Sequence, residues 1–317
     1  MPVLTVIVKS AEELAVADAP EPVPAAGQVL LEVDAVGVGY VDVMSRRGEY
    51  ATFPGAGATP GIEVVGRVVA TGPDTPDGLV GHRFLAVLPA FGGYAEKVVA
   101  DAERLLPAPE GADASDVAAV GLNALVAENA LHRTGVSVGE RVLVLGAGGG
   151  IGVHATQIAR ARGGEVTVVT SSAARGERLR ALGATHVVDR TSSAPPDGDT
   201  YDVIVDTVAG PALGQHLEQL RPNGRYVLCG GAAGPPPPDA FAPLLRDFHR
   251  SPTLYAFSLN SVTSQDLQLS WKRITALLAE ERLSPVIDQC LPLTEADAAL
   301  RRVEAGLPFG KVVLLPE

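Results

Sequence analysis

Hydrophobic residues in the first third of the chain occur in short runs rich in valine and leucine, and glycine and proline separate these runs. The runs cover residues 28–38, 61–71, 83–88 and 93–99. Short β-branched segments bounded by turn residues are typical of strands. A series of such strands at this spacing predicts a small antiparallel barrel that extends to about residue 121.

The pattern changes after Asp113, where segments of helical character begin to alternate with short apolar runs. We expect helices at 114–131, 151–162, 174–182 and 211–220. We expect strands at 141–145, 165–170, 185–188, 202–206 and 224–228. Strict alternation of strand and helix at this spacing predicts an α/β domain, a parallel, doubly wound sheet with right-handed crossovers.

The last quarter of the chain begins with a run of prolines at 235–238, which predicts a surface loop because proline cannot donate a backbone hydrogen bond. Beyond it we expect a helix at 264–281 and strands at 253–259, 285–289 and 311–315. This tail is too short to fold alone, so we expect it to complete the first domain. The predicted domains are residues 1–121 with 256–317, and residues 122–255.

Three glycines, Gly146, Gly149 and Gly152, lie between the predicted strand at 141–145 and the helix that follows it. Glycine lets the backbone approach a phosphate closely, and the N–H groups at a helix start bind anions. A strand, a glycine turn and a helix in this order hold the pyrophosphate of a dinucleotide. The spacing is not a strict G-x-G-x-x-G, so the prediction depends on the flanking elements as well.

The end of the next predicted strand indicates which dinucleotide is bound. Proteins that prefer NAD carry an acidic residue there for the ribose 2′-hydroxyl. Here the strand at 165–170 runs into Ser171 and Ser172, and Arg175 follows. The arginine fork matches a phosphate group, Ser171 adds a hydroxyl donor, and Arg190 closes the third strand at the same pocket edge. These residues favour NADPH, and the alternative is that both arginines are ordinary solvated charges.

Composition narrows the partners and the location. The 317 residues carry a net charge of −12, which excludes nucleic acid and anionic membranes as partners because both require a basic surface. Cys229 and Cys290 lie far apart without metal-type spacing, which predicts reduced thiols in a cytoplasmic protein. Neither a signal peptide nor an apolar run of membrane length is evident.

Several short motifs occur in an order that resembles the zinc-independent quinone oxidoreductase branch of the medium-chain dehydrogenase/reductase superfamily. The resemblance covers nearly the whole chain and rests on residues 37–50 (GVGYVDVMSRRGEY), 60–66, 92–96, 146–152, 182–184 and 310–313. It implies a GroES-like catalytic barrel with an inserted Rossmann domain. Zinc-dependent relatives hold their catalytic metal with a cysteine and a histidine at positions where this chain has Gly39 and Ile62. We therefore expect no metal.

The resemblance also implies further cofactor contacts, on the pyrophosphate, on the nicotinamide or at the closing edge of its pocket. Beside Ser171, Arg175 and Arg190, these residues are Asn123, Gly149, Gly150, Ile151, Gly230, Phe257, Leu259 and Lys311. Asn123 stands where a threonine is usual in the family. Relatives often carry asparagine and tyrosine at the positions of Gly39 and Met44, so this chain has an altered substrate side.

The leading hypothesis is hydride transfer from NADPH to a quinone or an α,β-unsaturated carbonyl compound, without metal. An alternative is an enoyl reductase for thioester or polyketide-like substrates, with Tyr50 as the first candidate proton donor and Tyr40 as the second. A further alternative is a non-catalytic NADPH-binding protein. The expected partners are a small-molecule substrate and a second copy of the chain, which would form a homodimer through the strand at 253–259.

Overall fold

The computed structural model describes residues 2–190 and 200–316. Internal contacts divide the chain into two compact units. The first comprises Met1–Leu122, Thr263–Trp271 and Pro285–Glu317, and the second comprises Asn123–Val262 and Lys272–Ser284. The contacts thus group residues 256–262 and 272–284 with the second unit, whereas the predicted domain limits place them in the first.

The first unit is built around a curled sheet in which β14, β15, β3, β4, β5 and β7 are neighbours in that order, with β6 also paired to β3. Most pairs are antiparallel, as predicted, but β14 and β15 run parallel. A separate antiparallel hairpin is formed by β1 and β2. The bounds are β1 Pro2–Ser10, β2 Glu13–Pro20, β3 Gln28–Val38, β4 Glu63–Thr71, β5 Arg83–Val87, β6 Lys97–Asp101, β7 Leu105–Pro107, β14 Ile287–Pro292 and β15 Lys311–Leu315.

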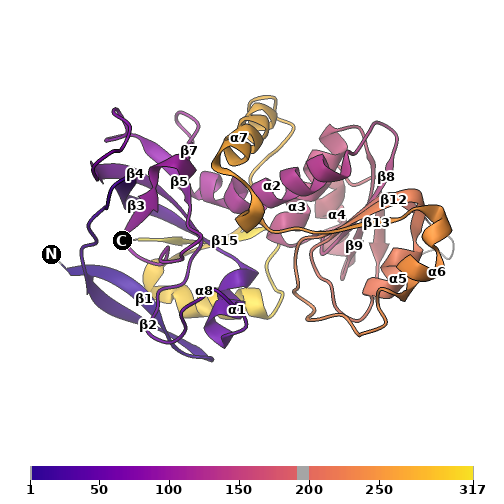
Figure 1. Cartoon of the computed structure of the whole chain (residues 1–317), viewed down its shortest axis with the longest axis horizontal. Helices are drawn as coiled ribbons and strands as arrows, with labels where there is room; N and C mark the ends of the chain where they lie inside the picture. Colours follow the sequence, from indigo (N-terminus) through magenta and orange to yellow (C-terminus); the bar gives the residue numbers. More distant parts are fainter. Residues whose placement is uncertain (1, 191–199, 317) are drawn as a thin grey trace. The chain divides into compact units, whose positions relative to one another are not determined.

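Two helices of the first unit, α1 (Tyr40–Arg47) and α8 (Ala296–Glu304), pack against each other (Figure 1). Five of the eight residues of α1 (YVDVMSRR) have modest helix propensity, among them two valines, which lose side-chain freedom in a helix. The helix is instead held at its start by the Asp42 carboxylate, which accepts the Gly39 N–H at 2.8 Å. It ends at Gly48, whose φ of 73° is readily adopted only by glycine.

The second unit contains a parallel sheet with the neighbour order β10, β9, β8, β11, β12, β13. This is the order of a doubly wound dinucleotide-binding fold, in which the winding direction reverses between β8 and β11. The predicted fold class is confirmed. The bounds are β8 Arg141–Leu145, β9 Glu165–Thr170, β10 His186–Asp189, β11 Tyr201–Asp206, β12 Leu220–Leu228 and β13 Thr253–Ala256.

Helices cover both faces of this sheet, with α3 and α4 on one side and α5 and α6 on the other (Figure 1). The central strands β8, β9 and β11 are largely buried as a result, and they contain continuous apolar runs such as Val142-Leu143-Val144-Leu145. The helices are α2 Ala114–Thr134, α3 Gly150–Ala161, α4 Ala173–Ala181, α5 Leu213–Glu218, α6 Ala242–Arg246 and α7 Ser264–Ala279. Short 3₁₀ turns are η1 Ala102–Arg104, η2 Phe248–Arg250, η3 Leu259–Ser261 and η4 Leu293–Glu295.

A helix kink and a strand end affect the positions of residues predicted to contact the cofactor. Helix α2 is kinked at Gly121, just before Asn123. Strand β13 ends at Ala256, earlier than the predicted limit of 259, and the 3₁₀ turn η3 begins at Leu259. Over the described ranges, none of the helices combines the length and the apolar character needed to cross a bilayer.

Candidate cofactor site

The glycine turn lies at the point where the sheet of the second unit reverses its winding. Strand β8 ends at Leu145, and helix α3 begins at Gly150 with Gly149 as its N-cap. Because the N-cap residue is a glycine, it has no side chain that could accept the first N–H groups of the helix. Its first N–H groups are therefore available to an anion, and the helix dipole favours one there.

Asn123 is packed directly against this helix start. A Cβ placed on Gly150 would overlap the Asn123 carboxamide, so the two predicted residues are in close contact. The side chain of Asn123 is only 7% exposed, and its Nδ2 has no hydrogen-bond partner among the described residues. A buried amide donor left unpaired is costly. An acceptor atom of a bound molecule at the start of α3 would satisfy it.

The residues predicted to bind the 2′-phosphate gather at the carboxyl ends of β9 and β10. The Arg190 N–H donates to the Thr170 carbonyl at 3.0 Å, and the Arg175 N–H donates to Ser172 Oγ at 3.3 Å at the start of α4. Ser171 lies between these two contacts in the chain. Arg175 is half-buried and Arg190 is exposed. The structure thus brings the backbones of the three residues to one edge of the sheet.

Thr207, which the sequence analysis did not single out, lies between Gly230 and the glycine turn. Gly230 follows β12, and a Cβ on it would overlap the Thr207 carbonyl. Thr207 follows β11, and its Oγ1 donates to the Leu145 carbonyl at 2.9 Å. Thr207 therefore lies between the two loops that were predicted to line the cofactor.

Phe257 and Leu259 lie beyond the end of β13. The Arg133 guanidinium stacks over the Phe257 ring, with 5.2 Å between its central carbon and the ring centroid. The Phe257 N–H continues the pairing of β13 with β12 by donating to the Leu228 carbonyl at 2.8 Å. Leu259 is buried at the start of η3. Their contact with the nicotinamide stays a prediction.

The remaining predicted residues, Tyr40, Tyr50 and Lys311, belong to the first unit. Tyr40 is the first residue of α1, and the Tyr50 ring meets Phe91 edge-on at 5.6 Å between centroids. The Lys311 ammonium forms an ion pair with Glu63, and the two side chains are 3% and 1% exposed. The other Glu63 oxygen accepts the Leu122 N–H at 2.8 Å, directly after the kink of α2.

A second buried carboxylate of the first unit, Asp42, accepts three hydrogen bonds. The donors are the Gly39 N–H at 2.8 Å, the Gly61 N–H at 3.0 Å and the Tyr94 hydroxyl at 3.1 Å. Burial raises the pKa of Asp42 to about 6, against the opposing effects of these donors and of Lys311. Asp42 thereby ties the start of α1 to the loop that carries Gly61 and Ile62.

Comparison with known proteins identifies the family. Residues 25–110 match the alcohol dehydrogenase GroES-like domain, and residues 182–314 match the family described as zinc-binding dehydrogenase. The mouse quinone oxidoreductase is 32% identical over 308 residues, which cover 93% of this chain and 91% of that protein. The chain belongs to the quinone oxidoreductase family of medium-chain dehydrogenases and reductases. The resemblance predicted from the motifs is confirmed.

Two other members of this wider family are informative. A mycobacterial protein, Rv1454c, whose structure was solved in complex with NADPH, superposes with a TM-score of 0.88 at 27% identity, covering 99% of this chain and all of that one. A mycocerosic acid synthase-like polyketide synthase of Mycolicibacterium smegmatis is 30% identical over 305 residues, which are 92% of this chain and 14% of the synthase.

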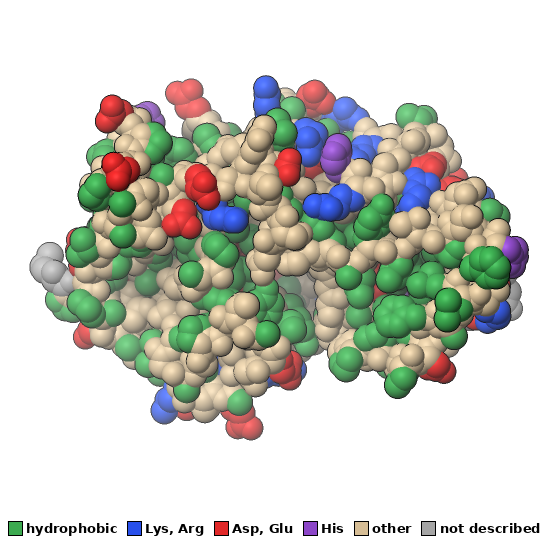
Figure 2. Space-filling view, in the orientation of Figure 1, with side chains coloured by type: hydrophobic (Ala, Val, Ile, Leu, Met, Phe, Trp, Pro, Cys, Tyr) green, Lys and Arg blue, Asp and Glu red, His purple; other side chains and the backbone are tan. Residues whose placement is uncertain are grey.

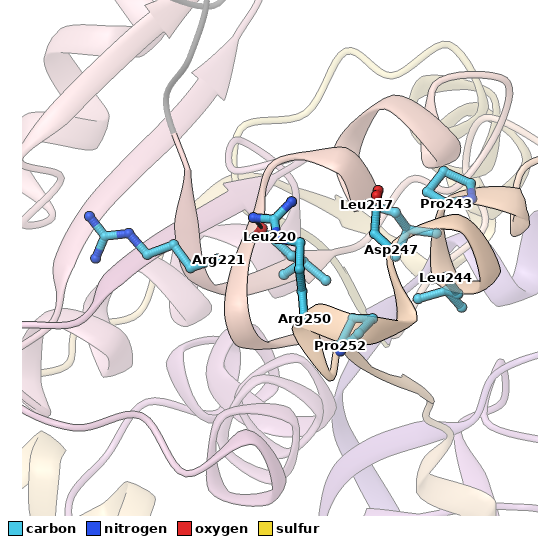
Figure 3. A pocket seen from close by; sticks show the side chains of 8 residues that line it. All are labelled: Leu217, Leu220, Arg221, Pro243, Leu244, Asp247, Arg250 and Pro252. Carbon is cyan, nitrogen blue, oxygen red and sulfur yellow. Dashed lines mark hydrogen bonds between the residues drawn. The ribbon is translucent and has the colours of Figure 1, made fainter.

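A pocket of the second unit lies outside the candidate cofactor site. Figure 3 shows it at the start of β12, near Leu220. In a parallel sheet the amino ends of the strands lie at the edge opposite to their carboxyl ends, so this pocket is remote from Gly146. Its lining residues are Leu217, Leu220, Arg221, Pro243, Leu244, Asp247, Arg250 and Pro252.

No cluster of three or more histidine, cysteine, aspartate or glutamate side chains suited to a metal ion occurs in the described ranges. The sequence analysis missed four buried residues with polar groups, Asp42, Glu63, Asp206 and Tyr226, and the half-buried Thr207. An acidic residue that ends an apolar strand, as Asp206 ends β11, was the available signal. Asp42 and Glu63 lie inside motifs that the resemblance already quoted, at residues 37–50 and 60–66.

Proposed function

We propose that the protein is an NADPH-dependent reductase that transfers hydride to a quinone or to an α,β-unsaturated carbonyl compound. The observation that carries the proposal is the uncapped start of α3 at the sheet's reversal point, with the unpaired amide of Asn123 buried beside it. Membership of the quinone oxidoreductase family and the likeness to an NADPH-bound relative support it.

The chain's residues have distinct tasks in this proposal. The backbone of Gly149, Gly150 and Ile151 binds the pyrophosphate, and the Asn123 amide donates to an acceptor atom on the nicotinamide side. Bound NADPH supplies the hydride. Ser171, Arg175 and Arg190 bind the 2′-phosphate at the ends of β9 and β10, because two guanidinium groups and a hydroxyl match its oxygens.

The proposal includes no metal. A conjugated acceptor is already electron-poor, so its carbonyl does not need a Lewis acid, and the chain carries Gly39 and Ile62 where zinc-dependent relatives place ligands. Prolonged dialysis against a strong chelator is therefore expected to leave turnover unchanged. A loss of turnover that added zinc restores would contradict this part of the proposal.

The likeness to a segment of a polyketide synthase favours a second candidate, reduction of an α,β-unsaturated thioester. That reaction benefits from a proton donor at the α-carbon, and Tyr50 is the first candidate, with Tyr40 second. The Tyr50 ring is fixed against Phe91, which leaves Tyr50→Phe a mild change in packing. If Tyr50→Phe reduces a thioester as fast as the wild type does, Tyr50 is not the donor.

The deciding experiment follows NADPH oxidation with a benzoquinone, a naphthoquinone, an enone and a crotonyl thioester, with NADH in parallel. Faster turnover with NADPH than with NADH supports the assignment of Arg175 and Arg190. The preferred acceptor chooses between the two reductases. Tight binding of NADPH without turnover of any acceptor would favour a non-catalytic NADPH-binding protein instead.

Arg175→Ala and Arg190→Ala sharpen the cofactor assignment. Loss of one guanidinium from the phosphate is expected to raise KM for NADPH by about tenfold to a hundredfold and to leave KM for NADH unchanged, since a charge-assisted hydrogen bond contributes about 1.5 to 3 kcal/mol. Arg178→Ala, on the same helix as Arg175, is the matched control. An equal effect on both dinucleotides would contradict the 2′-phosphate role.

The proposal also includes a homodimer formed at the edge of the second unit's sheet. Strand β13 is an edge strand of this sheet, and its Tyr255 is exposed. Three further exposed hydrophobic residues lie on the segment before it, Phe241, Leu245 and Phe248. Figure 2 shows hydrophobic side chains gathered over the region of α5 and α6. Phe248→Glu with Tyr255→Glu is expected to give a monomer in sedimentation analysis, and a wild-type monomer would refute the dimer.

We place the protein in the cytoplasm, where the thiols of Cys229 and Cys290, which are both free cysteines, stay reduced. Cell fractionation of the native host tests this location.

A further inference from the structure

The turn after β11 is held by a buried aspartate. Asp206 is fully buried, and its Oδ1 accepts the N–H groups of Val208 at 2.8 Å and Ala209 at 3.0 Å. Ala209 has a φ of 56°, a left-handed conformation that is unfavourable for a residue with a side chain. The two hydrogen bonds from this turn to the carboxylate offset that cost and fix the turn in one conformation.

Tyr226, on the neighbouring strand β12, completes the arrangement. Its hydroxyl donates to the other oxygen of Asp206 at 2.5 Å, and its side chain is fully buried. Burial, the negative charge of Asp206 and this hydrogen bond all raise the pKa of Tyr226, so the hydroxyl keeps its proton. Burial and Asp206 likewise raise the pKa of the nearby Cys229 thiol to about 12, which keeps it neutral.

The turn fixed by Asp206 connects the loops of the proposed cofactor site. Thr207 donates from Oγ1 to the carbonyl of Leu145, the last residue of β8. A Cβ on Gly146 would overlap Thr207 Oγ1, and one on Gly230 would overlap the Thr207 carbonyl. Thr207 therefore sets the spacing between the glycine turn after β8 and the loop after β12. It does so at the reversal point, where dinucleotides bind in such sheets.

We propose that Asp206 and Tyr226 are positioning residues for NADPH, which act through Thr207 on the loops at Gly146 and Gly230. The inference rests on the proposed NADPH site. Neither side chain needs to touch the cofactor. Their contribution is preorganisation, because a turn that is already in the binding conformation does not have to be ordered when the ligand arrives.

The test uses two near-isosteric variants, Tyr226→Phe and Asp206→Asn, in the full-length protein. Kd for NADPH is measured by fluorescence titration without substrate, and KM and kcat are measured with the best acceptor. Losing a hydrogen bond to a charged group is expected to raise both Kd and KM about tenfold. At saturating NADPH, kcat is expected to stay within about twofold of the wild type, because the bound state regains the same loop positions.

Tyr201→Phe is the matched control. Tyr201 is also a buried tyrosine of this sheet, but it begins β11 at the edge opposite to the glycine turn. It is expected to leave Kd unchanged. The free energy of unfolding of each variant without NADPH shows that the proteins compared are folded, and it separates a general loss of stability from a loss of preorganisation.

Each outcome decides the inference. A raised Kd with an unchanged kcat in Tyr226→Phe, but not in Tyr201→Phe, supports it. Wild-type Kd in both Asp206→Asn and Tyr226→Phe overturns it while leaving the proposed function intact. If all three variants lose affinity for NADPH, kcat and stability in parallel, the inference is also overturned, since Asp206 and Tyr226 then have only a structural role. Failure of the wild type to bind NADPH overturns the proposed function and this inference together.

Discussion

Both units bury an aspartate that accepts a tyrosine hydroxyl and two backbone N–H groups, yet the two aspartates organise the chain differently. Asp206 holds mostly its own turn, with its N–H donors two and three residues ahead and Tyr226 on the adjacent strand. Asp42 joins three segments, because its donors lie at Gly39, Gly61 and Tyr94. One carboxylate shapes a loop, and the other ties loops of a curled sheet together.

The surroundings of the two carboxylates differ as well. The positive charge of Lys311 lowers the pKa of Asp42, but burial has the larger effect and raises it. Asp206 lies instead among the tyrosine hydroxyl and the Cys229 thiol, whose own pKa values its charge raises. The same hydrogen-bond pattern therefore serves long-range assembly in one unit and local preorganisation in the other.

The largest expected effect comes from removing the cation near Asp42. Lys311→Met leaves Glu63 charged and almost fully buried without its partner, which is expected to destabilise the protein by about 3 to 5 kcal/mol. Chemical denaturation measures the loss. The double variant Lys311→Met with Glu63→Gln is the control, and it is expected to recover much of the stability. No recovery would show that packing, and not charge, is responsible.

Substitution of each aspartate by alanine tests the comparison directly. Asp42→Ala and Asp206→Ala each leave three buried hydrogen-bond donors without an acceptor. Both variants are therefore expected to lose about 3 kcal/mol of unfolding free energy. Only Asp206→Ala is expected to raise Kd for NADPH, in titrations under conditions where both proteins are folded. If Asp42→Ala weakens NADPH binding equally, the distinction between assembly and preorganisation is wrong.

Many of the strands were predictable from local sequence, although β1, β2 and β7 were not among the predicted segments. The limits of β3, β8, β9 and β15 agree with the predicted segments, since each is a valine-rich run bounded by turns. Helices α1, α6 and α8 were not predicted. For α1 the reason is physical, because a carboxylate hydrogen-bonded to Gly61 and Tyr94 stabilises a sequence with poor helix propensity.

The candidate cofactor site was also predictable only in part. The glycine turn and Asn123 follow from a local motif and a family resemblance. The role of Asp206, Thr207 and Tyr226 depends on β8 and β11 being neighbours, although about 60 residues separate Leu145 from Asp206 in the chain. Strand order is a property of the whole fold, so no short pattern around Thr207 reveals that it contacts Gly146.

A pH dependence follows from the raised pKa of Asp42. The folded protein binds this proton more tightly than the unfolded chain does, so the resulting stabilisation is present below the unfolded pKa, near 3.8, and is lost as pH rises through about 6. Between those limits the wild type is expected to lose about 2 to 3 kcal/mol relative to Asp42→Asn, which cannot titrate. Denaturant unfolding at several pH values measures this difference, and a difference that stays constant with pH would contradict the raised pKa of Asp42.

The smallest effect separates the two tyrosines. The Tyr226 hydroxyl is 2.5 Å from its carboxylate and the Tyr94 hydroxyl is 3.1 Å from its own, and shorter charge-assisted hydrogen bonds are stronger. Tyr94→Phe is therefore expected to cost about 1 kcal/mol and Tyr226→Phe about 2 kcal/mol. Because the Tyr94 hydroxyl lowers the pKa of Asp42, Tyr94→Phe should also shift the pH-dependent loss of stability to higher pH. An unshifted profile in Tyr94→Phe would contradict the contribution of the Tyr94 hydroxyl to the pKa of Asp42.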